Sequence, residues 1–129
     1  MSFINVNQIA AIAVGGALGS VMRYAMSGWV GIMAGRHFPY GTLAVNVLGS
    51  LAMGFLFVLF TERLSDNVIW RAGLLIGVLG GFTTFSSFSI ETLNLIEQGD
   101  ILKAFVNVIA SVMLCLLATW IGVVVARSI

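Results

Sequence analysis

The chain has 129 residues, of which 60% are apolar and only 9% are charged, and its mean hydropathy is +1.09. These values exclude a soluble globular domain, in which the charged fraction is far higher. The net charge of +1 and the scattered basic residues also argue against a nucleic-acid surface or a polybasic lipid-binding tract.

Hydropathy divides the chain into four apolar stretches, which are separated by polar or turn-forming linkers. A helix needs about 20 mostly apolar residues to cross a bilayer, so each stretch has the length of one span. We therefore predict an all-α membrane protein in which residues 1–129 form a single domain of four transmembrane helices. The stretches are residues 9–33, 42–60, 69–96 and 101–126.

Small residues recur at intervals of four in the first three stretches, which predicts close packing between helices. The first stretch also contains Arg23, for which two interpretations are open. Its side chain either extends toward the lipid head groups or attracts anions toward a pore mouth. The small residues are Gly15 and Gly19, then Ser50 and Gly54, then Gly73, Gly77 and Gly81.

The second stretch carries one strongly polar side chain near its middle, Asn46. A polar residue inside a membrane is costly unless it is satisfied or used. The amide of Asn46 can donate two hydrogen bonds to an anion. Hydrogen bonding to a neighbouring helix is the alternative.

The third stretch contains two glycines and five hydroxyl side chains within residues 80–89. This composition predicts a helix that is broken at mid-membrane depth. Broken helices at that depth commonly form ion sites. A kinked but continuous helix that is rich in hydroxyls is the alternative.

Two aromatic residues follow the predicted break, at a spacing that places them on one helix face. Phe85 and Phe88 would then meet ions as well as lipid, and the electropositive edges of their rings can solvate a small anion. Ordinary packing is the alternative. Glu91 would repel anions inside a pore, so we expect it in a vestibule or in a hydrogen bond with a neighbour.

The fourth stretch has a seam of polar residues with a period of four: Asn107, Ser111, Cys115 and Thr119. The seam is either a hydrogen-bonding track for an ion or a set of contacts between helices. Cys115, as the sole cysteine, cannot form an intrachain disulfide, and we expect a buried structural thiol.

The basic residues are balanced between the two sides of the membrane. With four spans, Arg63, Arg71 and Arg127 lie on one side, and Arg36, Lys103 and the end of Arg23 on the other. The positive-inside rule then favours neither orientation. Two oppositely inserted copies can pair about a twofold axis in the membrane plane, which predicts dual topology. The alternative is one orientation that other signals fix.

Catalysis is not expected. The single His37 is a linker residue, and no span contains a carboxylate pair or a cluster of metal ligands.

Three sequence blocks together resemble the Fluc (CrcB) family of microbial fluoride channels. They are residues 15–24 in the first helix, Gly41 and Thr42 with Asn46 and with Gly49 and Ser50 in the second, and residues 80–89 in the third. They occur in the family's order, whereas the fourth helix is similar only in length and apolar character.

The resemblance implies a passive channel in the inner (plasma) membrane that exports fluoride through two pores of an antiparallel homodimer. It implies that Phe85 and Phe88 are the ring pair that faces fluoride, with Asn46 as donor and with Ser86 and Ser89 extending the polar track. It also implies a structural Na⁺ on the twofold axis, held by the backbone carbonyls of Gly80 and Thr83.

A small multidrug transporter is the main alternative, because it is also a four-helix dimer of dual topology. Such a protein needs a carboxylate in the first helix for proton exchange, and here the first stretch has no Asp or Glu. A non-transporting subunit of a larger complex is a third alternative.

Overall fold

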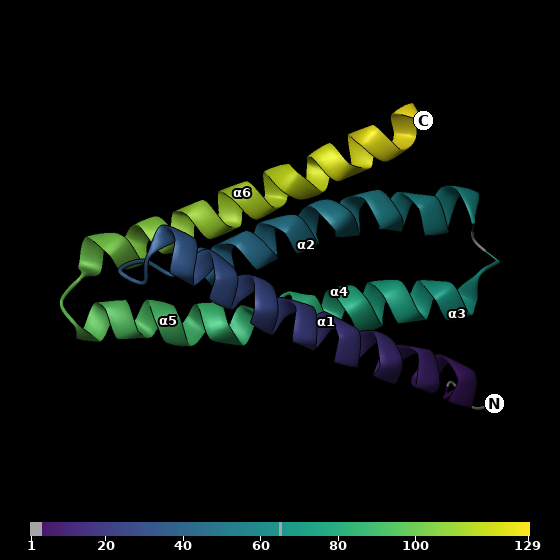
Figure 1. The fold of residues 1–129 in the computed structure, drawn as a ribbon. Helices are drawn as coiled ribbons and strands as arrows, with labels where there is room; N and C mark the ends of the chain where they lie inside the picture. Colours follow the sequence, from purple (N-terminus) through teal and green to yellow (C-terminus); the bar gives the residue numbers. More distant parts are fainter. Residues whose placement is uncertain (1–3, 65) are drawn as a thin grey trace.

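The computed structural model describes residues 4–64 and 66–129, and within these ranges it contains only helices and short connections (Figure 1). Four segments are long and apolar enough to cross a membrane, and each predicted stretch falls inside one of them. The prediction of an all-α chain with four membrane-spanning helices is therefore confirmed for the described residues. The segments are α1 (Val6–Ala34), Tyr40–Arg63, Val68–Glu97 and α6 (Ile101–Ser128).

The second and third segments are composite. Each contains a π-helical stretch, in which the helix is locally wider than an α-helix. The second segment consists of α2 (Tyr40–Val58) and η1 (Leu59–Arg63). The third consists of α3 (Val68–Arg71), η2 (Ala72–Val78), α4 (Leu79–Phe82) and α5 (Phe85–Glu97).

The segments run alternately up and down. Both chain ends and the connection from η1 to α3 lie at one end of the molecule, whereas the α1–α2 loop and the α5–α6 turn lie at the other (Figure 1). Gly35 lies in the α1–α2 loop and Gly99 in the α5–α6 turn. Both connections are tight turns that require positive φ angles, 94° and 83°, which glycine adopts without strain and a residue with a side chain does not.

Glycines set the distance between α1 and the third segment. A Cβ atom at Gly15 would collide with the carbonyl of Gly73, and one at Gly19 would collide with the carbonyl of Val78. Backbones that approach this closely gain dispersion energy without large side chains, as is usual in membranes. The small residues that the sequence singled out in these two segments thus lie at their contact.

The pairing of α2 with α6 follows the same rule. A Cβ atom at Gly54 would collide with the carbonyl of Thr119, and one at Gly122 would collide with the carbonyl of Leu51. The buried apolar cluster is small and consists of Phe60, Leu75 and Leu79, whereas many large apolar side chains are exposed. Such an exterior suits a lipid environment.

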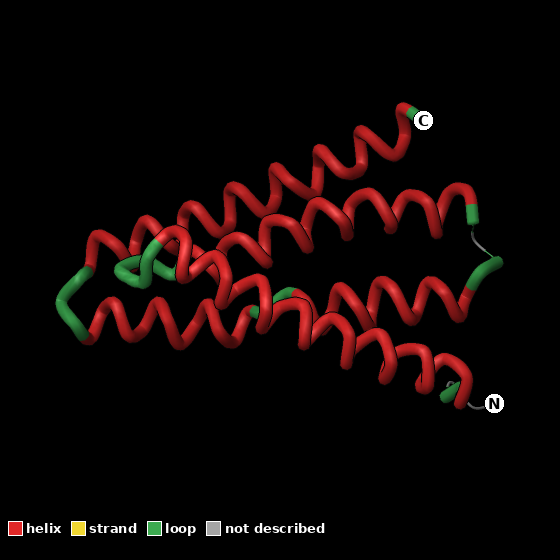
Figure 2. The backbone as a smooth tube through the Cα atoms, in the orientation of Figure 1, coloured by secondary structure: helices red, strands yellow, loops and turns green. Residues whose placement is uncertain are grey.

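The third segment is interrupted between α4 and α5. Thr83 and Thr84 have extended backbones, with ψ angles of 156° and 112°. Figure 2 shows a short loop within this segment. The interruption falls inside residues 80–89, where the sequence placed it.

We expect Gly19→Ala to destabilise the fold by about 1–3 kcal/mol, because the new methyl group overpacks against the Val78 carbonyl. Gly28→Ala is the matched control on the same helix, since nothing lies within 4 Å of its Cβ position. Thermal unfolding of the detergent-solubilised protein measures the difference, and equal unfolding temperatures for the two variants would contradict this packing.

Candidate functional site

The interruption in the third segment is held by Asn46 of α2. The side-chain amide of Asn46 donates to the carbonyl oxygen of Thr84 at 3.1 Å, and the Thr84 N–H donates to Asn46 Oδ1 at 2.8 Å. These bonds satisfy backbone groups that the break removes from the helical pattern. The interpretation of Asn46 as a bond to a neighbouring helix is therefore correct. One N–H of its amide is used in this way, so only the other N–H is left to donate to an anion.

The hydroxyl of Thr84 begins the second half-helix. Its Oγ1 accepts a hydrogen bond from the N–H of Ser87 at 3.1 Å, which makes Thr84 the N-cap of α5. The free N-terminal end of α5 carries the partial positive charge of the helix dipole.

A groove of about 460 Å³ lies beside the break. Thr83, Thr84 and Cys115 contribute to its wall. The groove therefore unites residues of α2, α5 and α6 that the sequence singled out separately. The predicted site residues that line it are Asn46, Phe85, Phe88, Ser111 and Thr119.

The two phenylalanines lie next to each other at the mouth of this groove. Their ring centroids are 5.3 Å apart and the rings are tilted by 45°. Phe88 is half-buried, whereas Phe85 is 78% exposed in the single chain. The Phe85 ring therefore lies on an open face of the protein.

The seam on α6 makes contacts between helices. Thr119 Oγ1 donates to the carbonyl of Cys115 at 2.9 Å and is also 3.2 Å from the Ser50 carbonyl of α2. Ser111 donates to Asn107 Oδ1 at 3.4 Å. The contact interpretation thus holds for Thr119, whereas the Ser111 bond lies within α6; both hydroxyls border the groove.

Asn107, which the sequence placed in the seam of the fourth helix, is bonded to Thr92, which the sequence did not place in the site. The buried Asn107 amide donates to Thr92 Oγ1 at 2.9 Å, and Thr92 donates to the Phe88 carbonyl at 2.7 Å. This chain of bonds links α6 to the helix turn that carries Phe88. The period of four on α6 pointed to Asn107, but its partner was not visible in the sequence.

Ser86 and Ser89 do not line the groove in the described chain. Both are exposed; Ser89 donates to the Phe85 carbonyl at 2.9 Å, and Ser86 Oγ lies 3.2 Å from Thr84 Oγ1. Within one chain, Ser86 and Ser89 therefore do not extend the polar track that the resemblance implied, because they lie on another face of α5 than the groove residues.

A second cavity, of about 800 Å³, lies on the other side of the break and is lined by Arg23, Arg36 and Glu91 among others. Glu91 accepts a hydrogen bond from Thr42 Oγ1 at 2.7 Å. Arg23 donates from Nε to the Gly81 carbonyl at 2.9 Å rather than extending to a head group. Arg23 and Glu91, which were expected at a vestibule, therefore both line this second cavity.

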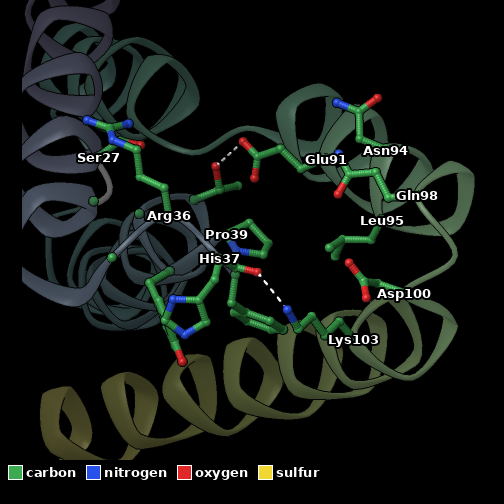
Figure 3. A pocket seen from close by; sticks show the side chains of 16 residues that line it. Ser27, Arg36, His37, Pro39, Glu91, Asn94, Leu95, Gln98, Asp100 and Lys103 are labelled. Carbon is green, nitrogen blue, oxygen red and sulfur yellow. Dashed lines mark hydrogen bonds between the residues drawn. The ribbon is translucent and has the colours of Figure 1, made fainter.

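Glu91 also borders a third cavity, of about 400 Å³, at the end of the molecule where the α1–α2 loop lies (Figure 3). Figure 3 shows Arg36 and His37 on one side of it and Asp100 on the other. Lys103 donates to the His37 carbonyl at 3.4 Å across this space. The cavity is polar and mixed in charge.

The carbonyls of Gly80 and Thr83 are free at the break. Among the described residues, no N–H group donates to either of them, because the Thr84 N–H bonds to Asn46 and the Ser87 N–H bonds to Thr84. The space around Gly80 is open, since nothing lies within 4 Å of its Cβ position. Both oxygens are available to a ligand or to another chain.

Four apolar spans, one of which is interrupted by a short polar stretch, define a multi-pass membrane protein. The family described as "CrcB-like protein, Camphor Resistance (CrcB)" matches residues 10–123. The chain therefore belongs to the CrcB family, as the sequence blocks indicated, and in bacteria such a protein lies in the inner membrane.

Relatives from several bacteria are similar over almost the whole chain, and each is named "Fluoride-specific ion channel FluC". The protein from Coxiella burnetii is 51% identical over 122 residues, which cover 94% of this chain and 98% of the relative. The protein from Magnetococcus marinus is 52% identical over 95% of this chain and 99% of its own. The protein from Geobacter sulfurreducens is 52% identical over 94% of this chain and 98% of the relative.

We expect Asn46→Ala to destabilise the protein by about 2–3 kcal/mol, because it leaves the N–H and the carbonyl of Thr84 without partners. Asn94→Ala, at an exposed position of α5, is the control. Thermal unfolding in detergent measures both. An unfolding temperature for Asn46→Ala equal to that of the control would show that the break does not depend on this amide.

Proposed function

We propose that this protein is a passive, fluoride-selective channel that exports fluoride from the cytoplasm. The observation that carries the proposal is the groove at the helix break, which the Phe85 and Phe88 rings line together with Asn46, whose amide has one N–H left to donate. The relatives that share about half of its residues are fluoride-specific channels. A channel is a transporter rather than an enzyme, in agreement with the sequence prediction.

The physical properties of fluoride fit such a groove. Fluoride is small and strongly hydrated, so a selective path must replace its water with closely placed donors. A full positive charge would hold the ion too tightly for conduction. Ring edges, a neutral amide and the N-terminus of α5 instead provide partial positive charges.

A small multidrug transporter is not favoured. The first span has no Asp or Glu to exchange protons, and the chain belongs to the CrcB family.

The working unit in this proposal is an antiparallel homodimer with two pores. The break divides the 30-residue third segment near its middle, which corresponds to mid-membrane depth when the segment spans the bilayer. The exposed Phe85 ring and the open side of Gly80 supply surfaces for a second copy. With Arg23 bonded at the break, three basic residues on one side face two on the other, and so small a difference allows that copy to insert in the opposite orientation.

The same proposal includes a structural Na⁺ between the two subunits. The carbonyls of Gly80 and Thr83 are suitable ligands, because unwound backbone commonly coordinates Na⁺ in membrane proteins and these two oxygens accept no N–H among the described residues. The cation would offset the partial negative charge that gathers where carbonyls of two chains meet. Ser86 and Ser89, which are exposed in one chain, would reach the fluoride path only through the dimer.

We expect the C-terminus to lie on both sides of the membrane in a cell population. Cys115→Ser with a new cysteine at Ile129 provides a single labelling site, and a membrane-impermeant thiol reagent should label about half of it in sealed vesicles, as dual insertion requires. Complete labelling, or none, would contradict the antiparallel dimer.

Liposomes that contain the purified protein should release fluoride rapidly and chloride hardly at all, because the groove supplies donors without a full charge that would also hold larger halides. Ion-selective electrodes measure both effluxes. Equal release of the two ions would contradict the channel assignment.

Within the same assay, Phe85→Ala or Phe88→Ala should lower the fluoride efflux by about tenfold or more, since each removes a ring edge from the path. Chemical cross-linking should show the dimer still assembled. Phe57→Ala, at an exposed ring on α2 away from the groove, is the matched control. Normal efflux in both groove variants would show that these rings contribute to packing and not to the fluoride path.

A further inference from the structure

Among the described residues, the hydrogen bond from Arg23 to the Gly81 carbonyl is the one that joins α1 to the interrupted segment at its break. The guanidinium Nε lies 2.9 Å from the carbonyl oxygen. In an uninterrupted helix this oxygen would accept the N–H of Phe85, which now lies beyond the break. Arg23 therefore replaces a lost backbone hydrogen bond.

The position of Arg23 on α1 explains why its side chain reaches the break. Gly15, Gly19 and Arg23 follow one another at intervals of four and so lie on one face of the helix. The two glycines bring the α1 backbone against η2 and α4, and Arg23 is the next residue on that face. Its side chain extends over the end of α4, where a positive charge also complements the helix dipole.

Two helices therefore hold the break from different sides. Asn46 of α2 fixes Thr84, and Arg23 of α1 fixes Gly81. The carbonyls of Gly80 and Thr83 belong to the same short segment and are left free. Each peptide unit is planar, so the Gly81 carbonyl is separated from that of Gly80 by the φ and ψ angles of one residue, and from that of Thr83 by those of two. Fixing the Gly81 carbonyl therefore narrows the directions that both free carbonyls can take.

We propose that Arg23 is a positioning residue of the fluoride path: it fixes the end of α4 through the Gly81 carbonyl and so aims the Gly80 and Thr83 carbonyls at the cation. This inference rests on the proposed function. It differs from a role in attracting anions, which needs only the charge of Arg23 and its exposure to the second cavity.

Arg23→Lys separates the two roles, because lysine keeps the charge but cannot place a planar N–H donor at the position of Nε. Arg23→Gln removes the charge as well. The matched control is Arg71→Lys, which makes the same change at an exposed residue that is remote in sequence from the break. All variants are studied as the full-length protein in liposomes, with Na⁺ replaced stepwise by a large organic cation.

For both Arg23 variants, we expect the Na⁺ concentration that gives half-maximal fluoride efflux to rise by about tenfold or more, as the loss of one charge-assisted hydrogen bond implies. The Arg71→Lys control should match the unaltered protein. A general loss of folded dimer would lower the maximal efflux without moving this midpoint. Wild-type efflux and an unmoved midpoint in Arg23→Lys would overturn the inference in favour of charge attraction.

Hydrogen exchange provides a second measurement that needs neither fluoride nor sodium transport. Amides of residues 79–90 should exchange faster in Arg23→Lys than in Arg71→Lys, and equal exchange would overturn the inference. If the unaltered protein releases no fluoride, the proposed function is wrong. If it releases fluoride independently of Na⁺, the proposed structural cation is wrong. The exchange result then still decides whether Arg23 holds the break.

Discussion

An interrupted helix inside a membrane must find all its hydrogen-bond partners within the protein, because lipid offers none. In this chain, side chains from two neighbouring helices meet part of that demand at the interruption at Thr83 and Thr84. Asn46 pairs with both backbone groups of Thr84, and Arg23 pairs with the Gly81 carbonyl. The direction in which α5 leaves the break, and with it the position of the Phe rings, depends on these bonds.

Those bonds are possible only because the helices approach one another closely. Glycines at the contact of α1 with η2 and α4 bring Arg23 within reach of the break. On the other side, Gly54 and Gly122 bring α6 against α2, so that its hydroxyl seam borders the same groove. The smallest residues of the chain thus determine which polar side chains meet.

A single chain leaves part of this site exposed. The Phe85 ring is largely uncovered, and Gly80 is exposed, with nothing within 4 Å of its Cβ position. Free carbonyls facing lipid are costly, whereas the same groups at a contact between two chains can bind a cation. The proposed dimer accounts for both features, and it also explains why a chain of this size carries no strong charge bias.

The sequence by itself determined the four spans, because the apolar length that a bilayer requires is a local property of the chain. It also located the break, through glycines and hydroxyls, and singled out Asn46, Phe85 and Phe88. Only the tertiary structure decided the partners: Arg23 with Gly81, Thr42 with Glu91, and Thr92 with Asn107. It also turned Ser86 and Ser89 away from the groove. The reason is that periodicity assigns a residue to a face of its own helix, whereas the rotation and separation of neighbouring helices, set here by glycine contacts, decide what that face meets.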